Sequence, residues 1–286
     1  MTSRMKNKNT SKVNYYPSAL TISCSDSCGG AGIQADLRTF NAYAVYGCCA
    51  LTSVASMNNS RIDAIQNVSA QLVANQIDTV LEGVPLKFAK SGILPDAEII
   101  RAVAQSVEKH KLKLVVDTVT FSQKWQKYTE KNICKTMQDT LLKLAYAVTA
   151  DIAEAEILLD CRIKDEQGMF EAAQKISERF GVLAVVGGGK FEKNRYTADA
   201  VAFDGALYQL RSPVLKNCRH THGVSCTMSA ALCANLALGA EWDDALLEAK
   251  TFVFGSLAEP VRIGDETEVM YPPETDYSEH ISLLEI

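Results

Sequence analysis

The residues His220-Thr221-His222-Gly223-Val224-Ser225-Cys226-Thr227-Met228-Ser229-Ala230-Ala231 set the architecture of this chain. A glycine-containing turn runs directly into a small, apolar run from Ser229 to Leu238, which predicts a buried helix. Backbone N–H groups at such a helix start have no helical partner, and the dipole adds about half a positive charge there. The turn is therefore a candidate site for an anion, above all a phosphate in transfer.

Cys226 lies in the first turn of this predicted helix. The positive end of a helix favours a thiolate, so we expect the pKa of the Cys226 thiol to be depressed. The alternative is a glycine turn followed by a core helix with a buried structural thiol, and this stretch alone fits that alternative better.

A second stretch, Ser25 to Asp36, contains the glycine-rich turn Cys28-Gly29-Gly30-Ala31-Gly32. It follows an apolar strand at residues 19–23 and precedes a helix. Strand, glycine turn and helix form a ligand-binding arrangement in α/β proteins, because glycines let the backbone approach a substrate closely. The spacing is neither the dinucleotide fingerprint nor the P-loop.

Apolar strands alternate with helical patterns along the rest of the chain. This alternation predicts βαβ units and a mostly parallel sheet, with helices on both faces. The expected strands cover residues 48–56, 88–92, 114–117, 145–149 and 183–186, with a hairpin at 198–203 and 206–210, and the expected helices cover 69–82, 96–110, 154–159 and 167–180. Ligands of such sheets bind beyond the carboxyl ends of the strands, where Asp26, Asp117, Asp151 and residues 187–189 fall.

Length and composition indicate one large domain. The 286 residues are 47% hydrophobic, which is enough for a sizeable core. We expect a disordered tail at residues 1–17, the folded domain at 18–263, and a loosely packed acidic tail at 264–286.

The charge pattern excludes two classes of partner. A formal charge of −5 without a basic cluster argues against nucleic acid, and no apolar run is long enough to span a bilayer. The nine cysteines are scattered singly through apolar elements or turns, and no secretion signal is present. Free thiols in a reducing cytoplasm are therefore expected.

Residues 24–36 and 221–231 together resemble the ribokinase-like vitamin kinases, specifically the hydroxymethylpyrimidine/phosphomethylpyrimidine kinases of thiamine biosynthesis, with the pyridoxal kinases next. The first matches a GSDSSGGAGIQAD-like run and the second a THGTGCT-SAA run. The resemblance covers about residues 18–257 in one collinear order. It implies a three-layer α/β/α fold, a cytoplasmic homodimer, and phosphorylation of a small heterocyclic alcohol with ATP and Mg²⁺.

The resemblance also implies roles for individual residues. Cys226 would take the hydroxyl proton, and the backbone of Gly223, Val224 and Ser225 would form the anion hole. The residues that would bind the heterocycle are Cys24, Asp26, Ala31, Asp36, Met57, Ile93 and Val119.

Two substrate-side positions depart from the pyrimidine kinases. Met57 stands where they usually have Gln, and Ile93 where they usually have Met. Methionine can only pack against a heterocycle, whereas Gln can form a hydrogen bond with it. Some pyridoxal kinases resemble this chain at Met57, so a pyridoxal or pyridoxine substrate is the alternative.

The nucleotide side departs further. The family's TPN-x-x-E motif corresponds to residues 149–154 here, whose sequence is TADIAE. Asp151 and Glu154 are the implied Mg²⁺ and phosphate ligands. Its KGGH motif reads 187–190, so Gly188, Gly189 and Lys190 are the implied phosphate contacts, and Ser225 replaces a glycine of the anion-hole loop. A heterocycle-binding relative without efficient transfer is therefore a second alternative.

A zinc site is a further alternative of a different class. Cys218, His220, His222 and Cys226 lie within nine residues of one another. Their spacing matches no common zinc signature, so we expect no structural zinc here.

Overall fold

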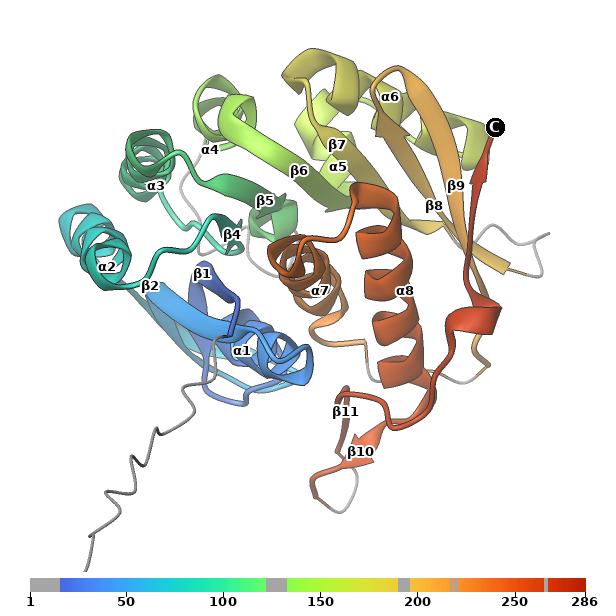
Figure 1. The fold of residues 1–286 in the computed structure, drawn as a ribbon, viewed down its shortest axis with the longest axis horizontal. Helices are drawn as coiled ribbons and strands as arrows, with labels where there is room; N and C mark the ends of the chain where they lie inside the picture. Colours follow the sequence, from blue (N-terminus) through green and yellow to red (C-terminus); the bar gives the residue numbers. More distant parts are fainter. Residues whose placement is uncertain (1–15, 122–132, 190–195, 217, 219–220, 265–266) are drawn as a thin grey trace, which may run out of the picture.

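A computed structural model describes residues 16–121, 133–189, 196–216, 218, 221–264 and 267–286 of the chain. A ten-stranded sheet forms its centre, in the order β12-β9-β8-β7-β6-β5-β4-β1-β2-β3 (Figure 1). The strands from β2 to β7 in this order are parallel, and the pairs at both edges are antiparallel. The predicted α/β fold with a mostly parallel sheet is confirmed.

The strands agree with the expected apolar segments. The strands of the large sheet are β1 (Ser18–Asp26), β2 (Tyr46–Met57), β3 (Ile62–Asn67), β4 (Phe88–Ser91), β5 (Lys113–Asp117), β6 (Ala145–Asp151), β7 (Leu183–Gly189), β8 (Tyr196–Phe203), β9 (Ala206–Pro213) and β12 (Ser282–Glu285). The central parallel strands are covered on both faces, which explains why they read as continuous apolar runs.

Helices cover both faces of the sheet and make three layers. The helices are α1 (Gly32–Ala42), α2 (Ala70–Gly83), α3 (Ala97–His110), α4 (Ile133–Asp139), α5 (Ile152–Leu159), α6 (Glu166–Phe180), α7 (Val224–Leu238) and α8 (Trp242–Ala258). Helices α2 to α6 share one hydrophobic core with one face, and α1, α7 and α8 share a second core with the other (Figure 1). None of the helices in these described ranges is both long and apolar enough to cross a membrane.

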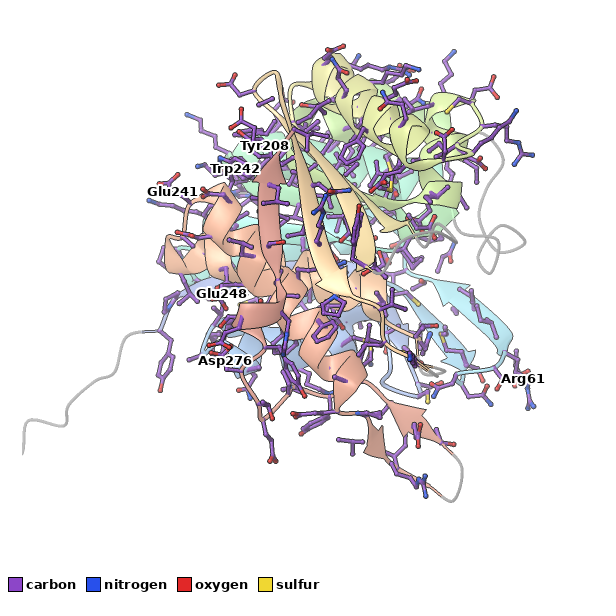
Figure 2. All side chains as sticks on the ribbon, turned by 90° about the vertical axis from the view of Figure 1, so that its right-hand side faces the viewer. Arg61, Tyr208, Glu241, Trp242, Glu248 and Asp276 are labelled. Carbon is purple, nitrogen blue, oxygen red and sulfur yellow. The ribbon has the colours of Figure 1, made fainter. Side chains whose placement is uncertain are left out.

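Helix α7 is the most enclosed helix of the second layer. It packs against α1, α8 and the sheet, and most of its side chains are buried. Small residues such as Ala230 and Ala231 permit this close packing. Helix α8 begins at Trp242, whose ring centroid lies 5.3 Å from that of Phe203 on β8 and 5.0 Å from that of Tyr208 on β9. Figure 2 labels Trp242 and Tyr208. This packing fixes the start of α8 against strands β8 and β9.

The C-terminal segment corrects one expectation. Residues 264–286 were expected to pack loosely, but β12 pairs antiparallel with β9 and forms an edge of the main sheet. Met270 and Ile281 are buried in the core beneath α8. This strand was not predicted because the segment is acidic and an edge strand needs few apolar residues. The expected tail at residues 1–17 lies almost wholly outside the described residues.

Candidate active site

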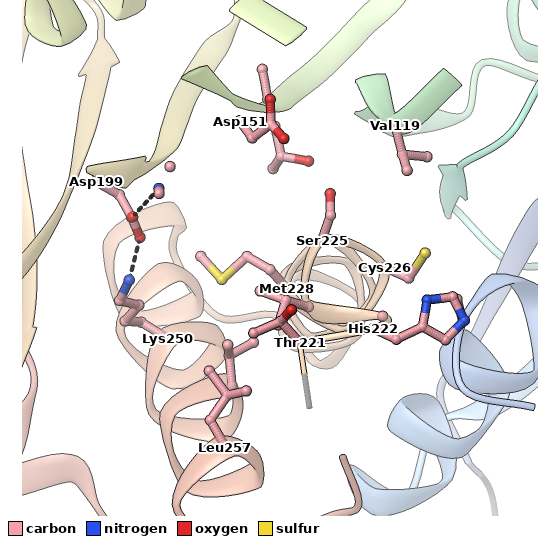
Figure 3. A pocket seen from close by; sticks show the side chains of 18 of the residues that line it. Val119, Asp151, Asp199, Thr221, His222, Ser225, Cys226, Met228, Lys250 and Leu257 are labelled. Atoms are coloured by element: carbon pink, nitrogen blue, oxygen red, sulfur yellow. Dashed lines mark hydrogen bonds and ion pairs between the residues drawn. The ribbon is translucent and has the colours of Figure 1, made fainter. Parts of the chain in front are cut away.

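One cavity of about 560 Å³ opens at the carboxyl edge of the parallel strands (Figure 3). The turn after β1, the start of α7, the β6–α5 junction, β7, β8 and α8 all contribute to its walls. The cavity therefore lies where an open parallel sheet places its ligands.

Most of the site residues expected from the sequence line this cavity. Those that do so are Cys24, Asp26, Ala31, Met57, Ile93, Val119, Asp151, Glu154, Gly188, Gly223, Val224, Ser225 and Cys226. Gly189 ends β7, and Lys190 lies outside the described residues. Segments up to about 200 residues apart in sequence thus meet at one site.

Asp26 organises the turn after β1. Its carboxylate accepts hydrogen bonds from the N–H groups of Cys28 at 2.8 Å and Ala31 at 2.9 Å. The His222 Nε2 atom lies 3.0 Å from Asp26 Oδ2 and joins this turn to the loop before α7. Burial alone would raise the pKa of Asp26, but the bonds from His222 and the two amides outweigh it and lower that pKa. Asp26 is therefore held as a carboxylate at neutral pH.

Glycines bring the two loops into contact. A Cβ atom at Gly223 would lie 2.0 Å from the carbonyl oxygen of Gly30, and Gly223 has a φ of +92°. No other residue meets both conditions without moving the backbone. The glycine turn at the start of α7 is thus required by its approach to the first turn.

The first turn of α7 is tied to the end of β5. Ser225 donates a hydrogen bond from Oγ to Asp117 Oδ1 at 2.5 Å, and Ser229 Oγ lies 3.2 Å from Asp117 Oδ2. The N–H of Val119 also reaches Asp117 Oδ1, at 3.3 Å. Ser225 stands where the vitamin kinases have a glycine, and in this chain its hydroxyl group has a structural partner in Asp117.

A buried ion pair lies behind this contact, and sequence reasoning missed it. Lys90 Nζ is 2.9 Å from both carboxylate oxygens of Asp36 and 3.8 Å from Asp117 Oδ2, and the Lys90 and Asp36 side chains are both 0% exposed. Burial would lower the pKa of Lys90, but the two carboxylates outweigh it and raise that pKa. A lysine inside the apolar strand β4 was the available signal, because a buried ammonium needs a buried partner.

The position of Asp36 corrects a prediction. Asp36 was expected to bind the heterocycle, but its carboxylate points behind the cavity wall and bonds to Lys90 and to Thr21 Oγ1, which is 2.5 Å away. Asp36 is not among the residues that line the cavity. Its place on α1, one turn after the glycine loop, turns the side chain toward the sheet.

The predicted depression of the Cys226 pKa is wrong. The thiol does line the cavity, but the residue is 4% exposed. Burial raises the pKa of the Cys226 thiol to about 12, and the charge of Lys90 opposes this shift only in part. Loss of hydration outweighs the helix dipole because the thiolate would be a buried charge.

The expected magnesium residues form a capping box at the start of α5. Asp151 accepts the N–H of Glu154 at 2.7 Å, and Glu154 Oε2 accepts the N–H of Asp151 at 2.9 Å. Thr118 Oγ1 also donates to Glu154 Oε2, at 3.0 Å. Burial raises the pKa of Glu154 to about 8, with the charges of Asp117 and Asp151 adding to the shift.

A second ion pair that the sequence did not predict lies at the other end of the cavity. Lys250 Nζ on α8 lies 2.6 Å from Asp199 Oδ2 on β8, and Gly188 donates its N–H to Asp199 Oδ1 at 3.2 Å (Figure 3). Lys250 and Asp199 both line the cavity. The Lys250 ammonium therefore places a positive charge at this end of the site.

The wall beside Met57 is apolar. Met57 is 7% exposed and packs in a small cluster with Cys24, Ala55, Ile62 and Ile93. Its backbone is fixed by Ser27, whose Oγ bonds to both the N–H and the carbonyl of Met57. The Met57 side chain offers a flat ligand an apolar contact and no hydrogen bond.

No group of three or more His, Cys, Asp or Glu side chains could hold a metal ion in the part of the chain that the structure describes. His220, one of the four residues considered for zinc, lies outside that part. All nine cysteines are free thiols.

Comparisons with known proteins agree on one family. The family model for phosphomethylpyrimidine kinase matches residues 26–270. A hydroxymethylpyrimidine/phosphomethylpyrimidine kinase of Synechococcus elongatus is 34% identical over 248 residues, which cover 87% of this chain and 94% of the relative. A pyridoxine kinase of Bacillus subtilis is also 34% identical, over 245 residues that cover 84% of this chain and 90% of the relative.

A solved structure extends the similarity to the fold. The pyridoxal kinase from Staphylococcus aureus, in complex with AMP-PCP and pyridoxal, matches with a TM-score of 0.83 at 26% identity. The match covers 95% of this chain and 100% of that one.

Proposed function

The chain belongs to the phosphomethylpyrimidine kinase family, which is ribokinase-like and related to the pyridoxal kinases, and we propose that it phosphorylates 4-amino-5-hydroxymethyl-2-methylpyrimidine, its monophosphate, or both. As an ATP-dependent kinase of this family, it transfers a phosphoryl group to a hydroxyl group. The observation that carries the proposal is the shared cavity, which has the Asp26 turn and Cys226 at one end and Asp151 and Lys250 at the other.

The start of α7 lies between these two ends and would receive the transferring group. The N–H groups of its first turn have no acceptor within the helix, although the Val224 N–H donates to the carbonyl oxygen of Thr221 at 3.3 Å, and the dipole adds positive charge there. Phosphoryl transfer depends mainly on positioning and on stabilising charge at the equatorial oxygens. Gly223, Val224 and Ser225 therefore serve as the anion hole in this proposal.

Cys226 serves as the acceptor of the hydroxyl proton in its thiolate form. Because burial raises the pKa of the Cys226 thiol to about 12, the thiolate is a minor form at pH 7 in the free protein. The buried ammonium of Lys90 is the charge that favours its formation. A rare thiolate of high pKa is a strong base, so the rate should follow the amount of thiolate.

The residues at the β6–α5 junction fit a magnesium ion carried by the nucleotide. Magnesium prefers oxygen ligands, usually one or two carboxylates together with substrate phosphates. Asp151 and Glu154 supply carboxylates, and the buried Thr149 hydroxyl in the same wall has no hydrogen-bond partner among the described residues. These residues would hold the ion, which supplies charge neutralisation at the phosphate oxygens. In this role Glu154 must lose its proton, because its pKa is raised to about 8.

Pyridoxal or pyridoxine is the second candidate substrate, and Met57 is the observation that favours it. The cluster around Met57 offers apolar packing without an amide to bind the amino-pyrimidine. The similarity of this chain to a pyridoxine kinase and to a pyridoxal kinase supports the same second candidate.

The test is phosphorylation of both heterocycles by the full chain with ATP and Mg²⁺. We expect a higher kcat/KM for the pyrimidine than for pyridoxal. Met57→Gln should raise the pyrimidine-to-pyridoxal ratio by roughly tenfold, the effect of one added hydrogen bond. Met57→Leu, which keeps the wall apolar, is the matched control and should leave the ratio unchanged.

Two outcomes would contradict the proposal. A wild-type preference for pyridoxal would select the second candidate. Binding of a heterocycle without transfer to any of them would identify a non-catalytic relative, in which the changes at Asp151, Gly187 and Ser225 have removed activity.

A further inference from the structure

Residues 271–286 follow the stretch that the family model matches, and they pack along α8 toward the edge of the sheet (Figure 1). This C-terminal segment contains a short 3-10 helix, η3 (Ser278–His280), and strand β12. Both of its ends are anchored, because Met270 is buried just before it and β12 pairs with β9. The segment therefore has a defined position against α8.

Gly255 lets the segment approach α8 closely. A Cβ atom at Gly255 would lie 2.8 Å from Pro273 Cβ and 2.9 Å from Tyr277 Cδ2. Glu259, which follows the last turn of α8, accepts two hydrogen bonds from the segment, one from the N–H of Glu274 and one from the Tyr277 hydroxyl, both at 2.9 Å. The Tyr277 ring is therefore held at a fixed place on the helix.

Phe254 contacts this ring and also lines the cavity. The ring centroids of Phe254 and Tyr277 lie 5.4 Å apart with the planes at 71°, which is an edge-to-face arrangement. The His280 ring lies 6.1 Å from Phe254 on the same segment. Phe254 is 7% exposed and is one of the residues of the cavity wall. The C-terminal segment thus reaches the cavity through one aromatic side chain.

The wall that contains Phe254 is the apolar part of α8. Val253, Phe254 and Leu257 line the cavity one to two turns after Lys250 on the same helix, and Figure 3 labels Lys250 and Leu257. Lys250 marks the end of the cavity that the proposed function assigns to the nucleotide. Contacts between close-packed apolar groups weaken when one group shifts by a fraction of an ångström. The position of Phe254 should therefore affect how tightly a nucleotide binds.

We propose that Tyr277 is a positioning residue that holds Phe254 in the cavity wall, so that the C-terminal segment contributes to nucleotide binding through Phe254. This inference rests on the proposed transfer from ATP. In it the Tyr277 ring packs against the Phe254 ring, and the hydroxyl contact with Glu259 only keeps the Tyr277 ring in place. The segment thereby joins the edge of the sheet to the wall of the site.

The test is calorimetric binding of adenosine, ADP and 4-amino-5-hydroxymethyl-2-methylpyrimidine to the full chain in the presence of Mg²⁺. Tyr277→Ala should weaken adenosine and ADP binding by the same factor, roughly 2- to 10-fold, the effect of one aromatic pair. Pyrimidine binding should be nearly unchanged, because the Asp26 turn and the Met57 wall remain. Tyr46→Ala, which removes a tyrosine ring that is 65% exposed at the start of β2, is the control and should change none of the three affinities.

Two further variants separate the ring contact from a general structural role. Tyr277→Phe keeps the ring and loses only the hydroxyl, so it should retain most of the ADP affinity. In a Phe254→Leu background, Tyr277→Ala should weaken ADP binding no further, because a residue that acts through Phe254 has no effect once that ring is gone. Tyr277→Leu, which keeps an apolar side chain against Gly255, takes the place of Tyr277→Ala in these comparisons if the alanine variant does not fold.

Four results would overturn the inference. They are unchanged ADP affinity in Tyr277→Ala, an equal loss in Tyr277→Phe, an equal loss for the pyrimidine, and additive losses in the double variant. In all four the wild type still binds ADP, and the proposed function stands. A wild-type chain that binds no nucleotide would instead overturn the proposed function and this inference together.

Discussion

The Ser225 hydroxyl donates a 2.5 Å hydrogen bond to Asp117, across 108 residues of sequence. This bond fastens the first turn of α7, where the transferring phosphoryl group is proposed to lie, to the carboxyl end of β5. It also places a neutral donor between the cavity and the buried Lys90–Asp36 pair. The start of α7 is therefore tied to the buried ionic cluster of Lys90, Asp36 and Asp117.

Replacing Ser225 tests this link. Ser225→Ala removes a donor to a buried carboxylate, so the free energy of unfolding should fall by about 1–3 kcal/mol. Urea denaturation of the purified chain measures the loss. The exposed Ser60→Ala is the control and should leave stability within about 0.5 kcal/mol of wild type. Equal stability of Ser225→Ala and wild type would show that the bond contributes nothing.

Lys90 neutralises two buried carboxylates, and its loss should be costly. Lys90→Met leaves Asp36 and Asp117 without their cation in a site that excludes water, so stability should fall by about 3–5 kcal/mol. Adding Asp36→Asn should recover part of this loss, because it removes one of the two uncompensated charges. If the double variant is less stable than Lys90→Met, charge compensation is not the reason for the loss.

Glu154 makes stability depend on pH. Its pKa is raised from the ordinary 4.5 to about 8 in the folded chain, so the folded state holds a proton that the unfolded state has lost in this range. Stability from this group is complete below about pH 4.5 and is lost as the pH rises toward 8, by at most about 1.4 kcal/mol per pH unit.

Glu154→Gln removes this titration and keeps an oxygen that can accept the bonds from Asp151 and Thr118. Relative to wild type, the variant should therefore gain stability as the pH rises from 5 to 8. Chemical denaturation at several pH values measures the difference, with the exposed Glu171→Gln as control. A difference between variant and wild type that does not change with pH would contradict the raised pKa.

Cys226→Ala should slow single-turnover transfer by roughly a hundredfold or more, the usual effect of losing a positioned proton acceptor. Heterocycle binding should change little, because the Asp26 turn and the Met57 wall remain. Cys233→Ala, which removes a buried thiol farther along α7, is the control for loss of a cysteine from this helix. Transfer at the wild-type rate by Cys226→Ala would mean that Cys226 is a structural thiol.

The pH dependence of the same reaction tests the thiolate. Because the pKa of Cys226 is raised to about 12, the thiolate fraction rises about tenfold per pH unit below that value. The wild-type transfer rate should therefore increase from pH 7 to pH 9. Cys226→Asp, whose carboxylate is a different acceptor, should retain measurable activity and show a smaller increase, since only the loss of the Glu154 proton, with its pKa of about 8, remains. A wild-type rate that is flat over this range would exclude the thiolate as the acceptor.

Local sequence patterns were sufficient for the sheet and for most of the cavity. Alternation of apolar strands and helices predicted the parallel core, and the two glycine turns predicted where ligands enter. These features are readable because strand and helix periods and the conformational freedom of glycine are properties of short segments. Strand β12 was not predicted, since a short edge strand at the end of an acidic segment has few apolar residues.

By itself, the sequence determined the family, the fold and the chemical groups at the site, from Cys226 and Asp26 to Asp151 and Glu154. Only the tertiary structure decided the charge state of Cys226, the turning of Asp36 toward Lys90, and the placing of Lys250 opposite Asp199. The physical reason is that a pKa and an ion pair depend on burial and on partners distant in sequence. Lys90 and Asp36 are 54 residues apart, and Lys250 and Asp199 are 51 apart. Their proximity exists only once the sheet and its two helical layers have formed.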